Sequence, residues 1–342
     1  MKKTLLLATC LTAATLGAQA QSTVQLMGLA DAYVGSIRMA GDAASKSVVG
    51  SGGMTTSWWG MSGSEDLGGG LKASFALNGF FRTDTGEAGR FGPDTQFSRD
   101  AYVSLSGGFG ALALGRGKAP NFLPTIVFNP MGDSFTFSPL VLHASNTRTL
   151  PGDDWIASNP SDTGWSNQIT YTTPDMAGLK ANLHYQPGEV ANDNGKKNIG
   201  FNLMYASGPL GLTAFWEKDQ VKNPVPAVLE GSATRTNWML GGSYDATVVK
   251  GFMTYGKSSS DLAGVADQKT LSLGLSAPVG NGKVLAAYAK TKVDQGNTRD
   301  TVTVGYDYNL SKRTDLYAML MNDKISNFES GNSLGLGVRH RF

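Results

Sequence analysis

The side chains best suited to catalysis are few in this 342-residue chain and lie far apart in the sequence. There are three histidines, His143, His184 and His340, and a single cysteine, Cys10. None of the histidines lies near a nucleophile motif such as G-x-S-x-G or a metal-binding pattern such as H-E-x-x-H. The sequence therefore predicts no catalytic group, no metal site and no cofactor, although residues distant in sequence can still meet in a fold.

The N-terminal twenty residues have the composition of a signal peptide. Two lysines precede an apolar stretch, which is followed by an A-Q-A sequence ending at Ala20, the small-x-small form of a cleavage site. We expect residues 1–20 to be removed and residues 21–342 to form one domain, because no linker or composition shift divides them. Removal takes away Cys10 and leaves 27 Lys+Arg against 27 Asp+Glu. Nothing then favours a nucleic-acid partner or thiol chemistry.

Hydrophobic residues recur at every second position in many segments of the chain, and their neighbours are mostly Gly, Ser, Thr, Asn and charged residues. This period of two predicts strands with one apolar and one polar face. After the first twenty residues no window of about 18 apolar residues occurs, which excludes a membrane-spanning helix. The clearest alternating segments are 71–77, 179–185, 199–205, 210–216, 271–277, 302–308 and 334–342.

The connections between these segments alternate between tight turns and long polar loops. Tight turns are expected near residues 64–70, 106–110, 174–178, 207–211, 278–283 and 309–313. Together with the alternation, this order predicts an all-β fold, a transmembrane antiparallel barrel of about 16 strands with a polar lumen. A secreted β-sandwich also alternates, but such domains are far shorter than this chain.

Several segments resemble the general porins of Gram-negative outer membranes, especially the β-proteobacterial type. They are "WGMSGSEDLGGGLKASFALN" (59–78), "RDAYVSLSGGFGALALGR" (99–116), "NQITYTTPDMAGLKANLHY" (167–185), "LSKRTDLYAML" (310–320) and the terminal "GVRHRF". The resemblance implies a homotrimer in outer-membrane lipid that passes ions and small hydrophilic solutes by diffusion. A substrate-specific channel for a sugar or dicarboxylate remains an alternative, and an outer-membrane barrel enzyme is a less favoured alternative. Inward positions that are mostly small and polar argue against the specific channel.

The stretch from Arg116 to Gly164 is too long for an ordinary connection. By resemblance it is the third outer loop, which folds into the lumen and narrows it. Asp133, Asp153 and Asp154 are then candidates for carboxylates at the narrowing. For each acid a solvated position on the outside remains open as an alternative.

On the wall opposite that loop, the resemblance implies a row of basic side chains. The candidates are Lys72, Arg82, Arg99 and Arg116. Where relatives generally read Ser-Arg-x-Gly-x-Arg-Gly-Ser-Glu-Asp, this chain reads "SWWGMSGSED", with Trp58 and Ser62 in the basic positions. Cations facing carboxylates across a narrow waist would create a transverse field that acts on ions and dipolar solutes.

The chain ends on an aromatic residue, Phe342. In the porins that this chain resembles, the last strand pairs with the first, here residues 23–34, and the terminal aromatic residue is recognised by the outer-membrane assembly machinery. The resemblance therefore implies that Phe342 is an assembly signal as well as a lipid-facing side chain. The alternative is that it belongs only to the aromatic girdle found in all such barrels.

Overall fold

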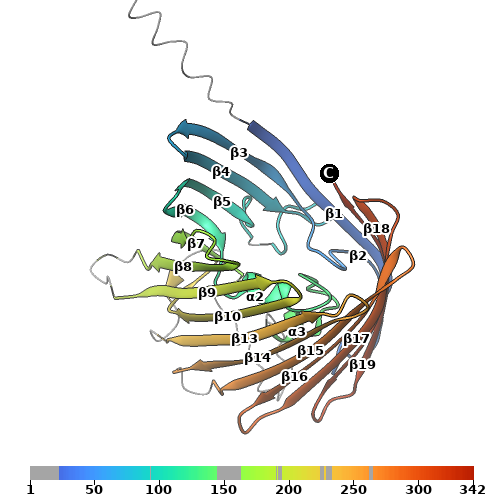
Figure 1. The fold of residues 1–342 in the computed structure, drawn as a ribbon. Coiled ribbons are helices and arrows are strands. Elements are labelled where there is room, and N and C mark those ends of the chain that lie inside the picture. The colour runs from blue at the N-terminus through green and yellow to red at the C-terminus, as the bar shows by residue number, and fades with distance from the viewer. Residues whose placement is uncertain are drawn as a thin grey trace, which may run out of the picture.

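The computed structural model describes residues 23–92, 94–144, 163–189, 191, 195–223, 227–228, 233–261 and 265–342. Its strands, apart from the separate pair β11 and β12, form a closed antiparallel barrel, with two short helices, α2 and α3, between its walls (Figure 1). No helix in the described ranges is long and apolar enough to cross a bilayer. The elements are β1 Thr23–Ile37, β2 Lys46–Ser51, β3 Trp58–Gly68, β4 Leu71–Phe80, β5 Asp100–Gly107, β6 Gly110–Lys118, α2 Phe122–Val127, α3 Pro139–Ala144, β7 Gly164–Thr172, β8 Leu179–Pro187, β9 Lys197–Ser207, β10 Leu210–Asp219, β11 Val221–Lys222, β12 Ala227–Val228, β13 Arg235–Asp245, β14 Lys250–Ser260, β15 Gln268–Val279, β16 Gly282–Val293, β17 Thr298–Asn309, β18 Thr314–Ile325 and β19 Gly331–Arg341.

The barrel sheet contains 17 strand segments but 16 strands, because β2 and β3 are two parts of one strand. Both pair with β1, β2 with its second half and β3 with its first half, and residues 52–57 interrupt the strand between them. On its other side β1 pairs with β19, where Leu29 lies opposite Arg341. The predicted strand number and the predicted closure of the barrel by its first and last strands are confirmed.

Side chains alternate between the two faces of the wall as the sequence predicts. On β15, Leu273 faces outward and is 43% exposed, whereas the neighbouring Ser272 faces inward and is 3% exposed. The same alternation follows the other strands, because the outer face borders lipid and the inner face borders the lumen. Tight turns join the strands at the end of the barrel that holds Thr23 and Phe342, and the longer loops lie at the opposite end.

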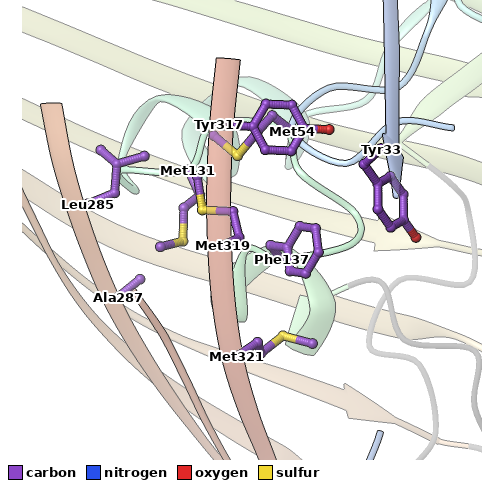
Figure 2. Packing of buried hydrophobic residues seen from close by; sticks show 9 residues of the cluster. All are labelled: Tyr33, Met54, Met131, Phe137, Leu285, Ala287, Tyr317, Met319 and Met321. Carbon is purple, nitrogen blue, oxygen red and sulfur yellow. The ribbon is translucent and has the colours of Figure 1, made fainter. Parts of the chain in front are cut away.

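A hydrophobic cluster lies inside the barrel, between its wall and the connection that follows β6 (Figure 2). Met131 and Phe137 come from that connection, and the remaining members come from strands and from the interruption between β2 and β3. The interior of the barrel therefore includes a packed region in addition to its polar lining. The cluster consists of Tyr33, Met54, Met131, Phe137, Leu285, Ala287, Tyr317, Met319 and Met321.

Candidate functional site

The connection between β6 and β7, here called loop 3, spans residues 119–163 and is described up to Ala144 and from Thr163 onward. Its helix α2 contacts β9 and β10, and its helix α3 contacts β15, β16 and β17. These contacts are made on the inner face of the barrel wall. Loop 3 therefore folds into the lumen, as the resemblance implied.

Asp31 of β1 is fully buried and holds the segment of chain to which the tip of loop 3 binds. Its carboxylate accepts hydrogen bonds from the backbone N–H groups of Gly53 (3.1 Å), Met54 (2.8 Å) and Thr55 (2.8 Å). The hydroxyl of Tyr317 on β18 donates a further bond, at 2.5 Å. Three backbone donors on one buried carboxylate fix the shape of the interruption at residues 52–57.

The tip of loop 3 binds this interruption through backbone carbonyl groups. The hydroxyl of Ser134 donates to the carbonyl of Gly53 at 2.6 Å, and the hydroxyl of Thr136 donates to the carbonyl of Gly52 at 3.1 Å. The adjacent Phe137 is fully buried and packs edge-on against Tyr33, with 5.7 Å between the ring centroids. The loop therefore crosses the lumen and is held on its far side.

Glycines on the barrel wall make room for loop 3. A Cβ atom at Gly335 would lie 2.4 Å from the ring of Phe137, and one at Gly274 would lie 2.4 Å from Pro130. Real Cβ atoms do not approach other atoms so closely, so any larger residue at either position would displace the loop. These glycines are required for close approach rather than for unusual backbone angles.

Two polar contacts hold the ends of the described part of loop 3. The amide of Asn121 donates to both carboxylate oxygens of Glu217 on β10, at 3.0 Å each. The imidazole of His143 is fully buried and lies 2.9 Å from the hydroxyl of Thr291 and 2.8 Å from that of Thr301. Burial lowers the pKa of His143 well below its usual value, so the ring is neutral at physiological pH.

The inner face of β3–β8, here called the bare wall, borders open space. A cavity of about 230 Å³ separates the β5–β8 part of this wall from Leu123 of loop 3. Most of the residues that line it have polar side chains, in contrast to the hydrophobic cluster on the other side of the lumen. They include Asp100, Ser104, Lys118, Gln168, Thr170, Thr172, Asn182 and His184.

Two of the predicted site residues meet at the edge of the bare wall. The guanidinium of Arg99 lies over the ring of Trp58, 3.8 Å from its centroid. Asp100 is 3.5 Å from Arg99 and 3.0 Å from the ammonium of Lys118, and it accepts a hydrogen bond from Asn78 at 3.1 Å. Trp58 thus holds the cation of its neighbour in place, as a ring face does for a guanidinium.

Asp133 is the predicted acid of loop 3 that the structure describes, and it is partly exposed. Burial raises the pKa of its carboxyl, while a hydrogen bond to Thr55 and the positive charges of Arg99 and Arg339 act in the opposite direction. The carboxyl group of Asp133 on loop 3 therefore interacts electrostatically with Arg99 on the bare wall. Asp153 and Asp154 lie outside the described residues.

The remaining basic candidates lie apart from this pair. Lys72 is exposed at the start of β4, beside the β3–β4 turn and so near the tight-turn end of the barrel. Arg82 lies in the connection after β4, where it pairs with the exposed Glu87 at 2.6 Å. Neither is brought close to Trp58 and Arg99 by a contact that the structure records.

Arg116 is 7% exposed, and its guanidinium is occupied by the protein itself. It donates to the backbone carbonyls of Ser98 (2.7 Å) and Gly164 (3.0 Å) and to the hydroxyl of Ser166 (3.0 Å). Arg116 lines the cavity, but these bonds occupy its guanidinium and disfavour it as a water-facing cation. The side chain instead ties the two ends of loop 3 to the preceding loop.

The terminal Phe342 continues the pairing that closes the barrel. Its backbone N–H and carbonyl bond to the carbonyl and N–H of Gly28, both at 3.0 Å, and its side chain is 48% exposed on the outer face. The ring covers Gly28, where an added Cβ would lie 2.4 Å from it. An outward-facing ring is expected both if Phe342 is an assembly signal and if it belongs only to the aromatic girdle.

Three features of the narrowing were not identified from the sequence: Asp31, Lys118 and the interruption at residues 52–57. The glycine-rich run that precedes Trp58 is a signal for a break in a strand. The buried apolar wall also leaves a signal, because "VLAAYA" (284–289) and "LYAMLM" (316–321) are apolar on both faces.

No group of His, Cys, Asp or Glu side chains suited to a metal ion occurs in the part of the chain that is described.

A closed antiparallel barrel with an apolar outer face and a loop across a polar lumen defines a channel of the bacterial outer membrane. The family model described as Gram-negative porin matches residues 7–327, and the chain belongs to this family.

Individual relatives agree with this assignment. Outer membrane porin protein 32 of Delftia acidovorans is 33% identical and an outer membrane porin protein of Bordetella pertussis is 29% identical, each over the full length of both chains. Among solved structures, an anion-selective porin from Comamonas acidovorans superposes with a TM-score of 0.74 at 28% identity, over 94% of this chain and 100% of that one. The protein is an outer-membrane porin, a channel for passive diffusion and not an enzyme.

Proposed function

We propose that ions and small hydrophilic solutes cross between loop 3 and the bare wall, through a transverse field. Arg99 and Lys118 supply the positive side of this field and Asp133 supplies the negative side. The observation that carries the proposal is the guanidinium of Arg99, which is fixed over Trp58 while its side chain remains 24% exposed. A charge held in place at a narrow waist acts on every ion that passes.

We further propose a modest preference for anions. The solved porin from Comamonas acidovorans is described as anion-selective, and this chain shares 28% identity with it. Trp58 replaces one expected cation here, and Asp100 lies within 3.5 Å of both Arg99 and Lys118. Neutral and acidic groups at these places weaken the positive field, so we expect the preference to be smaller than a complete basic row would give.

The test is the zero-current potential of single variants in planar bilayers across a salt gradient. Arg99→Gln should shift this potential toward cations, and Trp58→Arg should shift it toward anions. Both shifts should shrink between roughly 0.01 M and 1 M salt, because the Debye length falls from about 30 Å to about 3 Å. Arg313→Gln, an exposed residue of the β17–β18 turn, is the matched control. Unchanged potentials in both site variants would remove Arg99 and Trp58 from the permeation path.

Two further proposals follow from the family and from the closure of the barrel. Three copies would form a homotrimer, which a mass measurement of the folded protein in detergent would reveal. Phe342 would serve as the signal for the assembly machinery, so its deletion should reduce folded protein in the outer membrane far more than it reduces synthesis. Normal amounts of heat-modifiable protein after that deletion would exclude the signal.

We also propose that residues 1–20 are a signal peptide that is removed during export. Sequencing the N-terminus of protein purified from the outer membrane should give Gln21 as the first residue. A chain that still begins with Met1 would contradict this proposal.

A further inference from the structure

The carboxylate of Asp133 on loop 3 is held by the interruption at residues 52–57. The hydroxyl of Thr55 donates a hydrogen bond to this carboxylate. The next residue of the loop, Ser134, donates to the carbonyl of Gly53 at 2.6 Å. Two adjacent residues of loop 3 therefore bind the same short segment of chain, and that segment sets the place of the carboxylate.

Thr55 is in turn held by two strands of the barrel, and its side chain is buried. The guanidinium of Arg339 on β19 donates to the Thr55 hydroxyl at 2.9 Å. The backbone N–H of Thr55 donates to the carboxylate of Asp31 on β1 at 2.8 Å. Both the backbone and the side chain of Thr55 are therefore fixed by the strands that close the barrel.

Arg339 itself lies among carboxylates on the inner face of the wall. The strand register places it directly opposite Asp31 on one side and Asp315 of β18 on the other. Its Nε donates to Asp315 at 3.0 Å, and its Nη2 lies 3.4 Å from Asp307 of β17. Three acids around one guanidinium offset its charge, so its contribution comes from the geometry of its hydrogen bonds rather than from a field in the lumen.

The donor and acceptor properties of these groups fix the direction of the hydrogen bonds. A guanidinium can only donate, and a hydroxyl has a single hydrogen. Because the oxygen of Thr55 accepts from Arg339, its hydrogen points away from Arg339 and toward Asp133. An ionised carboxylate is the stronger acceptor for such a donor. The series Arg339, Thr55, Asp133 therefore favours the charged form of the loop 3 carboxyl.

We propose that Arg339 and Thr55 are positioning residues for the negative side of the waist. Arg339 orients the hydroxyl of Thr55, and Thr55 holds the carboxylate of Asp133 in place and in its charged form. The inference rests on the proposed function, in which Asp133 faces Arg99 across the waist. It adds that the charge of loop 3 is placed by the first and last strands of the barrel and not by loop 3 alone.

The groups around Asp133 act on its protonation in opposite directions. Burial raises the pKa of its carboxyl, whereas the hydrogen bond from Thr55 and the charges of Arg99 and Arg339 oppose this rise. Arg99 acts from the bare wall and Arg339 from β19, while the carboxylate of Asp31 lies behind the interruption. Without the hydroxyl of Thr55 burial is opposed less, so Asp133 should take up its proton at a higher pH.

The first test measures the zero-current potential against pH and follows the component that Asp133→Asn lacks. Thr55→Val keeps the side-chain shape but removes the hydroxyl, and should move the midpoint of this component up by about half a pH unit or more, because a hydrogen bond to a charged group is lost. Thr55→Ser keeps a hydroxyl and should restore the midpoint of the unaltered protein. Thr136→Val removes a different bond of loop 3, to the carbonyl of Gly52, and is the matched control with an unchanged midpoint.

The second test asks whether Arg339 acts through Thr55. Arg339→Lys keeps the charge but lacks the fork that reaches Thr55 and Asp315 together, so it should shift the midpoint in the same direction as Thr55→Val. The double variant R339K/T55V should shift it no further than Thr55→Val alone. Arg341→Lys alters another partner of Asp315, at 3.0 Å, and is the matched control with an unchanged midpoint.

The outcomes separate this inference from the proposed function. An unchanged potential in Asp133→Asn would remove Asp133 from the path, and both would be wrong. A shifted potential in Asp133→Asn with an unshifted midpoint in Thr55→Val would overturn only the positioning role. Equal shifts in Arg339→Lys and Arg341→Lys, or additive shifts in the double variant, would overturn the role of Arg339. Heat-modifiable mobility verifies that each variant is folded, and the Thr55 variants decide the question if Arg339→Lys does not fold.

Discussion

The two sides of the lumen are built from different residues, although both belong to one continuous sheet. The inner face of β9, β10 and β13–β19, here called the covered wall, carries glycines and apolar side chains, together with the buried polar partners of Asn121 and His143, where loop 3 rests on it. The bare wall of β3–β8 carries hydroxyl, amide and charged side chains. The inner face of this barrel therefore has two surfaces, one for docking a loop and one for contact with water.

The reason for this division is desolvation. Where loop 3 covers the wall, water is excluded, so an unpartnered polar side chain there would lower the stability of the barrel. Methionines suit such a surface because their flexible side chains fill irregular gaps, as Met131, Met319 and Met321 do here (Figure 2). The bare wall faces water and has no such requirement.

The largest effect is expected from removing an anchor on the covered wall. Phe137→Ala should lower the free energy of unfolding by about 3–5 kcal/mol, because it deletes a fully buried aromatic ring. It should also raise the single-channel conductance, since the tip of loop 3 loses its packing against Tyr33. Phe135→Ala, two residues away and partly exposed, is the control for both measurements. Unaltered conductance in Phe137→Ala would mean that this contact does not position the loop.

Arginine substitutions should have different effects on the lipid-facing surface, the covered wall and the bare wall. Leu273→Arg on the outer face should destabilise the barrel by about 2–4 kcal/mol in refolding titrations if it lies near the bilayer midplane. Alternation alone treats Ser74 and Ser272 alike as inward positions, but Ser272 is 3% exposed on the covered wall. Ser74→Arg should therefore be tolerated, whereas Ser272→Arg should displace loop 3. Equal tolerance at Ser74 and Ser272 would remove the distinction between the two walls.

A smaller effect is expected at Arg116, where the base of loop 3 meets the bare wall. Arg116→Gln should lower the free energy of unfolding by about 1–3 kcal/mol, because it leaves the carbonyls of Ser98 and Gly164 without their donor. The zero-current potential should change much less than in Arg99→Gln. A shift as large as that of Arg99→Gln would place the charge of Arg116 in the permeation path after all.

The smallest effect concerns pH. Burial raises the pKa of Asp133, so this carboxyl takes up a proton at a higher pH than an ordinary aspartate as the solution is acidified. Its negative charge is then lost while exposed carboxylates remain ionised, and the zero-current potential should move toward anions. The potential of Asp133→Asn should lack this component of the pH dependence. An identical pH profile in Asp133→Asn would assign the titration to another group.

Much of the fold follows from the sequence because a barrel wall obeys a period of two. Residues such as Leu273 and Ser272 could be assigned to their faces without coordinates, and Phe342 could be placed at the seam. The site was harder to predict. Arg116 reads as one more cation of a basic row, and only the contacts with Ser98 and Gly164 show that its charge is buried.

Contacts between distant segments explain most of what the sequence did not reveal. Asp31 resembles any other inward polar residue, and its role appears only when three backbone N–H groups converge on it. The assumption that inward positions are mostly small and polar holds for the bare wall but fails for Leu285 and Met319 on the covered wall. Those positions are apolar because loop 3 covers them. The alternation of residues along a strand does not indicate which segment will cover the strand.

The route of loop 3 also has a consequence for the order of events in folding. Its tip bonds to Gly53, which precedes it in the chain, while Phe137 packs against Gly335, near the C-terminus. The hydrogen bond between Asp31 and Tyr317 joins residues 286 positions apart and forms only once β1 and β19 have closed the barrel. Contacts of such long range are formed late, because the entropy of closing the intervening chain must be lost first. We therefore expect the nascent barrel to be a wider pore, whose narrow waist forms in a last, slow step after closure.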